Sequence, residues 1–293
     1  MAHKSGFVNI IGNPNVGKST LMNAMVGEKL CIVTAKAQTT RHRIMGIVNG
    51  EDFQIVYSDT PGILKPVYRL QQNMMNFVDS AIGDADVILY VTDTVEKADK
   101  NTEYISRLKD LACPVVIVIN KIDISDQARV KELMDWWSAR VPGALVLPAS
   151  AKEGFGMESI LHAVIERLPE SPAWYDKDTF TDRNLRFFAS EIIREKILLN
   201  YKDEIPYSCQ VEVESFKEGE ERYDISAIIY VMRDSQKGIL IGKKGAALKK
   251  TGTAARIEME DFFQKKVFLQ LLVKVDPDWR ESRRELRKFG YED

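Results

Sequence analysis

Hydrophobic positions in the first half of the chain form short continuous runs separated by stretches with helical spacing. Nearly continuous apolar runs are typical of central strands in a parallel sheet that is covered on both faces. Apolar residues that recur every three or four positions predict amphipathic helices. Strands are predicted at 7–11, 87–91, 114–119 and 145–148, and helices at 21–26, 101–111 and 157–168. This alternation predicts a doubly wound, mostly parallel α/β domain.

One hairpin and one loop interrupt that alternation. The runs 44–48 and 53–57 flank Asn49-Gly50, a pair that favours a tight turn between antiparallel strands. The preceding polar stretch 28–41 shows no apolar periodicity, so we expect it to be a mobile loop.

The second half has a different order of elements. Two prolines in 169–176 break the periodicity, and Thr181-Asp182-Arg183 is predicted to cap a helix that runs to about Leu198. Strands are predicted at 208–216, 223–232 and 267–273, with two short helices before the last one. We therefore predict an α/β domain over 1–169, a linker over 170–181, and an α+β domain over 182–293 that ends in a basic tail.

Composition is consistent with a two-domain soluble protein. The chain has 293 residues, of which 45% are hydrophobic and 29% are charged. Its three cysteines are far apart, which favours a reducing compartment and argues against a disulfide framework or a cysteine metal site. Because the sequence shows neither a long apolar leader nor an apolar run of membrane-spanning length, we expect a cytoplasmic location.

A glycine-bounded loop between the first strand and the first helix carries the strongest chemical signal. A strand, such a loop and a helix in this order predict a phosphate-binding P-loop. Its backbone N–H groups can surround a polyphosphate, Lys18 can reach the outer phosphates, and Ser19 can hold Mg²⁺. The loop reads Gly12, Asn13, Pro14, Asn15, Val16, Gly17, Lys18, Ser19 and Thr20.

Two further segments are predicted to complete the phosphate site. In a nucleotide switch, one threonine of the loop after the first helix binds magnesium and the terminal phosphate; we favour Thr40, with Thr39 as the alternative. Asp59-Thr60-Pro61-Gly62 follows a strand, where the acid can hold Mg²⁺ through water and the Gly62 N–H can contact the terminal phosphate. Lys18, Thr40 and Gly62 are thus the candidate catalytic groups.

Base recognition is predicted from two loops that each follow a strand. The Asp123 carboxylate of Asn120-Lys121-Ile122-Asp123 can accept two N–H donors from guanine, which adenine does not present in that arrangement. Asn120 would join this loop to the P-loop, and the stem of Lys121 would cover the base. The segment Ser150-Ala151-Lys152 resembles the loop of GTPases that offers a backbone N–H to the guanine oxygen, and this resemblance implies Ala151 as the donor.

A basic, glycine-containing turn lies between the two short helices of the second domain. No acid occurs between Ser235 and Ile257. This arrangement matches a type II KH domain, whose Gly-x-x-Gly loop clamps the backbone of single-stranded RNA; the alternative is a basic surface turn. The candidate RNA-binding residues are Gly238, Ile241, Gly242, Lys243, Lys244, Gly245, Lys249 and Lys250.

Together, these motifs resemble the TRAFAC class of GTPases, and the Thr-Arg of the first switch loop resembles its Era/TrmE-like branch. With the KH domain, nearly the whole chain resembles the Era family. The resemblance implies hydrolysis of GTP to GDP with Mg²⁺, binding to the 3′ end of 16S ribosomal RNA, and a role in maturation of the 30S subunit. A monomer is expected. Peripheral association with the inner membrane occurs in some members of the family.

The resemblance also bears on the rate of hydrolysis. Ile63 stands where Ras-like switches carry the glutamine that orients water, and an isoleucine cannot form hydrogen bonds, so we expect slow intrinsic turnover. In the Era/TrmE-like branch, the residue matching Asn15 is associated with a potassium ion that assists hydrolysis. The alternative is that Asn15 only hydrogen-bonds the loop.

Two other functions remain open at this stage. One is an RNA-binding assembly factor whose nucleotide is structural. The other is a membrane-associated cell-cycle regulator whose KH-like domain serves protein contacts. Under the favoured hypothesis, GTP orders the loops around Thr40 and Gly62 and thereby repositions the RNA-binding domain.

Overall fold

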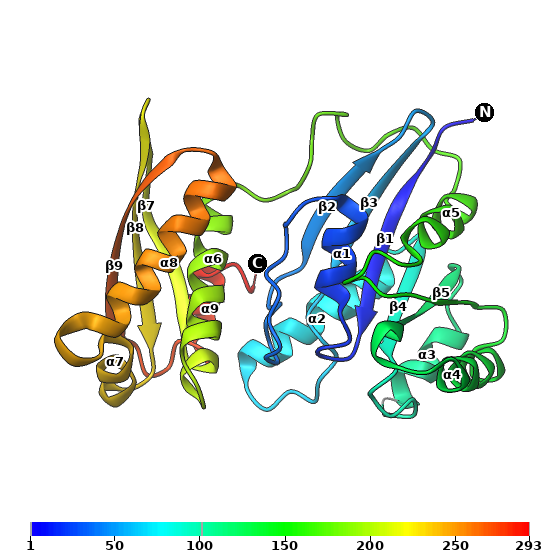
Figure 1. Ribbon diagram of the computed structural model, residues 1–293, viewed down its shortest axis with the longest axis horizontal. Helices are drawn as coiled ribbons and strands as arrows, with labels where there is room; N and C mark the ends of the chain where they lie inside the picture. Colours follow the sequence, from blue (N-terminus) through cyan, green and yellow to red (C-terminus); the bar gives the residue numbers. More distant parts are fainter. Residues whose placement is uncertain (1, 101, 293) are drawn as a thin grey trace. The chain divides into compact units, whose positions relative to one another are not determined.

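The computed structural model describes residues 2–100 and 102–292, and its contacts divide the chain into two compact units (Figure 1). Unit 1 comprises the residues up to Cys31, Thr40–Pro66 and Met74–Asp182. Unit 2 comprises Ile32–Thr39, Val67–Asn73 and the chain from Arg183 onward. Two short segments of the first half of the sequence therefore pack with the second half.

Unit 1 is built on a six-stranded sheet in the order β2-β3-β1-β4-β5-β6, in which only β2 runs antiparallel to its neighbour. Every residue of β4 and β5 is buried, as their apolar runs predicted. The strands are β1 Lys4–Gly12, β2 Ile44–Asn49, β3 Phe53–Asp59, β4 Val87–Asp93, β5 Val115–Asn120 and β6 Leu145–Pro148. The predicted hairpin and doubly wound sheet are confirmed.

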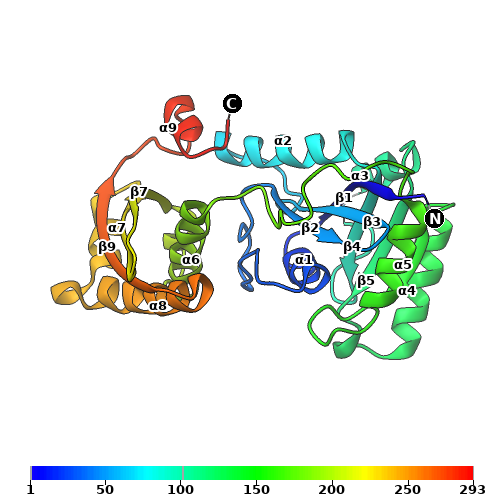
Figure 2. The same cartoon turned by 90° about the horizontal axis from the view of Figure 1, so that it is seen from above.

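Helices cover both faces of this sheet, with α1 and α2 on opposite sides (Figure 2). The helices are α1 Lys18–Val26, α2 Arg69–Gly83, α3 Thr102–Lys109, α4 Gln127–Arg140 and α5 Met157–Arg167. The helix predicted over 101–111 is α3, and Asn101 lies outside the described residues. Sequence reasoning missed α2 and α4. In α4, whose N-cap Asp126 accepts from Arg129 N, the buried stripe is narrow and includes Leu133 and Trp137.

Unit 2 contains a three-stranded sheet in the order β7-β8-β9, with β7 and β8 antiparallel and β8 and β9 parallel. Its core includes Ile193, Ile229 and Met259, each fully buried. The elements are α6 Leu185–Asn200, β7 Gln210–Glu218, β8 Arg222–Val231, α7 Asp234–Ile241, α8 Ala246–Phe263, β9 Lys266–Val275 and α9 Arg283–Lys288. The predicted order of helix, two strands, two helices and strand is confirmed.

The cap predicted for α6 is wrong. Asn184 is the N-cap, and its side chain accepts from the Phe187 N–H at 3.0 Å. The Thr181 hydroxyl instead donates to the Met45 carbonyl at 2.7 Å, and Asp182 accepts from the Met45 N–H at 3.1 Å. The end of the predicted linker therefore pairs with edge strand β2 inside unit 1. No helix among the described residues is long and apolar enough to cross a membrane.

Candidate nucleotide-binding and RNA-binding sites

Two glycines fix the shape of the predicted P-loop. Gly12 has φ +151°, and an added Cβ would lie 2.1 Å from the Val91 carbonyl oxygen. Gly17 has φ +95°, and a Cβ there would lie 2.2 Å from Asn120 Nδ2. No side chain fits at either position, because both the torsion and the space exclude one. Asn15 also lies in the left-handed region, with φ +66°, and is exposed.

Lys18 lies buried under this loop. Its Nζ donates to the Gly12 carbonyl at 3.1 Å and to the Asn13 carbonyl at 2.8 Å. Burial lowers the pKa of Lys18 to about 8, against the opposing attraction of Asp59 and Glu96. An anionic phosphate beside Nζ would favour the charged ammonium, so the site is electrostatically suited to a polyphosphate.

Three oxygens meet beside Lys18, one from each predicted magnesium-binding segment. Ser19 Oγ donates to Asp59 Oδ2 at 2.6 Å and lies 2.8 Å from Thr40 Oγ1, which in turn donates to Asp59 Oδ2 at 3.1 Å. Burial raises the pKa of Asp59, opposed by Lys18, by these hydroxyl groups and by the Cys31 thiol. Asp59 Oδ1 is buried and accepts no hydrogen bond among the described residues. Hard oxygen donors with an unpaired carboxylate oxygen fit Mg²⁺.

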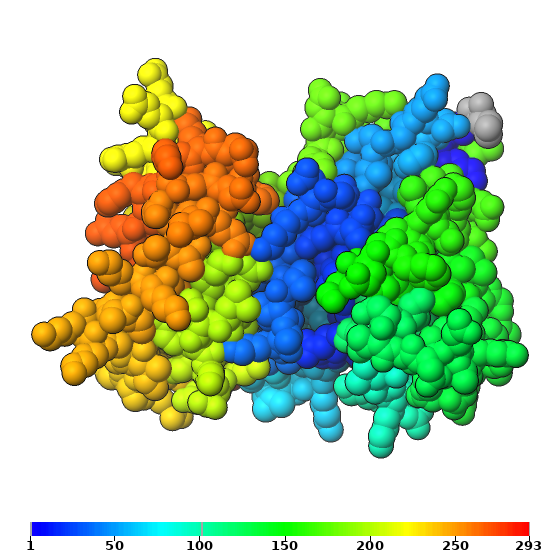
Figure 3. Space-filling view, viewed as in Figure 1, coloured from blue at the N-terminus to red at the C-terminus, as the bar shows by residue number. Residues whose placement is uncertain are grey.

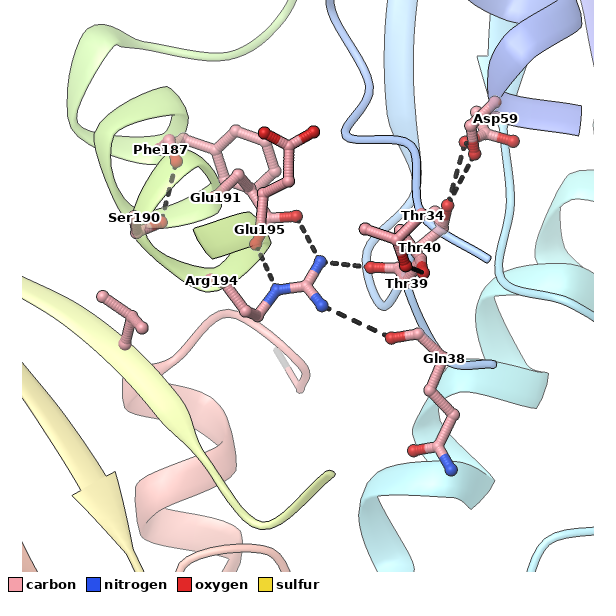
Figure 4. A network of polar contacts seen from close by, with 12 residues as sticks. Thr34, Gln38, Thr39, Thr40, Asp59, Phe187, Ser190, Glu191, Arg194 and Glu195 are labelled. Atoms are coloured by element: carbon pink, nitrogen blue, oxygen red, sulfur yellow. Dashed lines mark hydrogen bonds and ion pairs between the residues drawn. The ribbon is translucent and has the colours of Figure 1, made fainter. Parts of the chain in front are cut away.

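The same geometry distinguishes the two candidate threonines. The Thr39 hydroxyl donates to the Lys36 carbonyl at 2.7 Å and lies 2.6 Å from Thr34 Oγ1, so it is engaged within its own loop. Figure 4 shows Thr40 pointing to Asp59. The arrangement favours Thr40 as the switch threonine.

The segment after Asp59 packs directly on the P-loop. Thr60 Oγ1 donates to the Ile10 carbonyl at 2.8 Å, and the Ile63 N–H donates to the Gly12 carbonyl at 3.1 Å. A Cβ on Gly62 would lie 2.7 Å from Pro14 Cα, so its backbone can approach the loop only as glycine. The Ile63 side chain is buried and offers no group to orient water.

Asn120 joins the predicted base loops to the P-loop. Its Nδ2 donates to the Val16 carbonyl at 2.9 Å, and its Oδ1 accepts from the Ala151 N–H at 3.0 Å. The Ala151 N–H, which was expected to face a guanine oxygen, is thus already engaged, and contact with a base through it requires a shared hydrogen bond. Lys121 Nζ donates to the Asn15 carbonyl at 2.6 Å, which holds its stem across the P-loop.

Asp123 is oriented by the neighbouring loop. Ser150 Oγ donates to Asp123 Oδ1 at 2.6 Å, and Asp123 is exposed. Lys152, the last residue of the predicted base-binding set, is exposed and pairs with Glu153 at 3.1 Å. The structure therefore brings the P-loop, both switch segments and both base loops to the carboxyl edge of the sheet, the edge at which ligands bind in open α/β folds.

Sequence reasoning missed two acids in this site. Asn13 Nδ2 donates to Glu96 Oε2 at 2.7 Å, and Thr92 Oγ1 donates to Glu96 Oε1 at 2.8 Å. Burial raises the pKa of Glu96. Asp93 accepts from Lys121 Nζ at 2.6 Å. The only available signal was their position, since Asp93 is the last residue of β4 and Glu96 follows three residues later.

The predicted RNA clamp in unit 2 has the expected backbone. The turn between α7 and α8 holds Gly242 at φ +70° and Gly245 at φ +78°. Lys243 and Lys244 are exposed, and residues near 240–250 project from the surface (Figure 3). Ile241 is partly buried and packs against the core of unit 2, so its side chain contributes to packing.

An open groove of about 350 Å³ runs from this turn along α8 to β9. Its walls combine apolar and basic side chains, which suits bases together with phosphates. Two of the predicted residues, Gly245 and Lys249, line the groove. The rest of its lining consists of residues that were not predicted to bind RNA: Leu248, Gly252, Thr253, Arg256, Leu269 and Leu271. Lys250 is exposed on the same helix but does not line the groove.

Fold and sites together define a P-loop nucleotide-binding domain of the GTPase class followed by a KH domain. Comparison with protein families agrees: residues 7–121 match the model described as 50S ribosome-binding GTPase, and residues 204–280 match the KH domain model.

Individual relatives cover almost the entire chain. GTPase Era of Geobacter metallireducens is 46% identical over 98% of this chain and 98% of the relative, and chloroplastic GTPase ERA1 of Zea mays is 46% identical over 99% of this chain and 71% of the relative. The crystal structure of a variant of Aquifex aeolicus Era bound to GDP.AlF4- has a TM-score of 0.95 and 38% identity, and covers 99% of this chain and 100% of that one. The chain belongs to the Era family of GTPases.

Proposed function

We propose that this protein hydrolyses GTP to GDP and phosphate and binds the 3′ end of 16S ribosomal RNA during maturation of the 30S subunit. The observation that carries the enzymatic part is the meeting of Ser19, Thr40 and Asp59 beside the buried Lys18. P-loop chemistry depends on positioning and charge neutralisation, and these four side chains supply both.

The site supports Mg²⁺ as the metal. Ser19, Thr40 and Asp59 offer the oxygen ligands that this ion prefers, and it would neutralise phosphate charge together with Lys18. Thr40 N–H and Gly62 N–H are the proposed contacts to the terminal phosphate, and Asn120, Lys121 and Asp123 the proposed contacts to the base.

A potassium ion is proposed at Asn15. This residue is exposed, and no hydrogen bond engages its side-chain amide within the described part of the chain. That geometry speaks against the alternative in which the Asn15 amide only ties the loop together. Since Ile63 cannot orient water, a second cation near the phosphates is one way to raise slow turnover.

Support for the RNA partner comes from unit 2 and from a relative. The groove that begins at Gly245 combines the basic side chains of Lys249 and Arg256 with apolar walls. A crystal structure of Era in complex with MgGDPNP and nucleotides 1506–1542 of 16S ribosomal RNA has a TM-score of 0.95 to this chain at 38% identity. We propose the same RNA segment for this protein.

The proposed cycle links the two activities. GTP orders the segments around Thr40 and Gly62, the RNA-binding unit responds, and hydrolysis reverses the change. We propose that the protein acts as a monomer in the cytoplasm. Peripheral association with the inner membrane stays a prediction that sedimentation with anionic vesicles tests.

Two measurements test this function. Purified protein should release phosphate from GTP, faster in potassium than in sodium, and Asn15→Asp should remove the difference between the two ions. Crosslinking with 16S ribosomal RNA should map to its 3′ end and to the groove in unit 2. If the protein hydrolyses GTP neither with RNA nor without it, the nucleotide is a structural ligand and not a substrate.

A further inference from the structure

Helix α6 of unit 2 carries a buried ion pair whose position is not explained by RNA binding. Arg194 is 1% exposed and Glu191 is 7% exposed. Arg194 Nε donates to Glu191 Oε1 at 2.8 Å, and its Nη2 donates to Glu191 Oε2 at 2.5 Å. This two-point contact fixes the plane of the guanidinium group.

The remaining donors of that plane bind the switch segment Ile32–Thr39, which belongs to the same unit. Arg194 Nη1 donates to the Gln38 carbonyl at 3.3 Å, and Nη2 also donates to the Thr39 carbonyl. Figure 4 shows the guanidinium between Glu191 and these two carbonyl groups.

The Thr39 carbonyl shares one planar peptide with the Thr40 N–H. In a trans peptide these two groups point in opposite directions, so a donor that fixes the carbonyl also fixes the direction of the N–H. The Thr40 N–H is the proposed donor to the terminal phosphate, and the Thr40 hydroxyl already lies 2.8 Å from Ser19 Oγ. Arg194 therefore binds the carbonyl group of the same peptide that carries the Thr40 N–H.

Other contacts hold the same segment in place. Glu195 Oε1 accepts from the Val33 N–H at 3.4 Å, and Lys36 Nζ donates to the Tyr201 carbonyl. Tyr68, from the other short segment of unit 2, donates through its hydroxyl to Gln38 Oε1 at 3.0 Å. The segment is thus held at several points, but only Arg194 acts on the peptide that contains the Thr40 N–H among the described hydrogen bonds.

We propose that Arg194 is a positioning residue for GTP: oriented by Glu191, it sets the Thr39–Thr40 peptide so that Thr40 can contact the terminal phosphate and its metal. The inference rests on the proposed function of the nucleotide site. It assigns to the RNA-binding half of the sequence a residue that discriminates the triphosphate from the diphosphate. GDP lacks the terminal phosphate, so its affinity should not depend on this peptide.

The test uses variants that change the orientation of the Thr39–Thr40 peptide while the protein stays folded. Arg194→Lys keeps a cation beside Glu191 but lacks the planar fork, and Arg194→Met combined with Glu191→Leu removes the pair without leaving a buried charge. Arg186→Met is the matched control, because Arg186 lies on the same helix and also donates to carbonyl groups, those of Val213 and Glu214.

The measured quantities are the dissociation constants for GDPNP and GDP with Mg²⁺, and hydrogen exchange of residues 32–40 in nucleotide-free protein. Both Arg194 variants should bind GDPNP about tenfold more weakly and GDP within about twofold of the unmodified protein. Exchange of residues 32–40 should be faster. Arg186→Met should change none of these values.

Equal losses for GDPNP and GDP, or no loss for either, would overturn the assignment. If the unmodified protein binds neither nucleotide, the proposed function fails instead, and the exchange measurement still tests whether Arg194 orders the segment. If Arg194→Lys does not fold, the variant that combines Arg194→Met with Glu191→Leu tests the assignment, because it leaves no unpaired buried charge.

Discussion

Asn120 Nδ2 donates to the Val16 carbonyl at 2.9 Å and so joins the predicted base loop to the phosphate loop. Because the same side chain accepts from the Ala151 N–H, one residue links both predicted base loops to the predicted phosphate loop. We therefore expect the recognition of guanine and the binding of phosphate to depend on one shared set of hydrogen bonds at the edge of the sheet.

Guanine selectivity should depend on Asp123. Replacing Asp123 with Asn exchanges one acceptor for a donor and should lower the affinity for GTP about 100-fold, since a donor–acceptor mismatch that the bound base shields from water costs about 1–3 kcal/mol. Xanthosine triphosphate, which has an oxygen in place of the amino group, should bind the variant better than GTP. Equilibrium binding with both nucleotides measures this. An unchanged preference for GTP would place the base elsewhere.

Lys18 should leave a signature in the pH dependence of stability. Its pKa is lowered from 10.5 in the unfolded chain to about 8 in the folded protein, so the folded state holds fewer protons between these pH values. The free energy of unfolding should therefore gain up to about 3 kcal/mol from this group as pH rises through that window. Chemical denaturation of nucleotide-free protein measures it.

Lys18→Met is the control for this effect. The variant should lack the rise, so the difference between the two proteins isolates Lys18 from other groups that titrate in the same window. Parallel curves for the two proteins would show that the folded state does not shift the pKa of Lys18.

Metal dependence should depend on Asp59. In Asp59→Asn, Mg²⁺ should no longer tighten GDPNP binding, a loss of about 100-fold relative to the unmodified protein. Burial raises the pKa of Asp59, and the metal binds the ionised form, so the Mg²⁺ effect should weaken as pH falls, starting at a higher pH than for an ordinary aspartate. Titration of nucleotide with and without Mg²⁺ checks both. Retained Mg²⁺ dependence in the variant would exclude this carboxylate.

RNA affinity should depend on the turn between α7 and α8. Replacing Lys243 and Lys244 with Asp should weaken binding roughly tenfold or more and reduce the salt slope by about 1.4, the value for two phosphate contacts on a single strand. Replacing Lys217 and Lys274 with Glu makes the same change in net charge on exposed strand positions outside the groove. Equal effects of the two pairs would mean that net charge, and not the clamp, binds RNA.

Local pattern was sufficient to predict most of the fold and the phosphate loop. A few neighbouring residues were enough to predict three features: the torsions of Gly12 and Gly17, the buried strands β4 and β5, and the turn at Gly242. The cap of α6 was mispredicted because Thr181 and Asp182 are equally good caps by type, and their pairing with Met45 decided against them.

Contacts between residues far apart in the sequence could not be predicted. Glu96 lies in a polar stretch, and only the folded chain brings it to Asn13. The hydrogen bond from Arg194 to the Thr39 carbonyl joins two residues far apart in the sequence, and neither residue type indicates the other as its partner. The hydrogen bond from the Ala151 N–H to Asn120 illustrates the same limit, while the contact of this N–H with a base stays a prediction.

The central claim is that occupancy of the nucleotide site changes the affinity of the KH groove for RNA. Isothermal titration of the 3′ segment of 16S ribosomal RNA into protein loaded with GDPNP, loaded with GDP, or free of nucleotide tests it most directly. The account predicts dissociation constants that differ between the GDPNP and GDP forms by about fivefold or more. Three equal dissociation constants would contradict it.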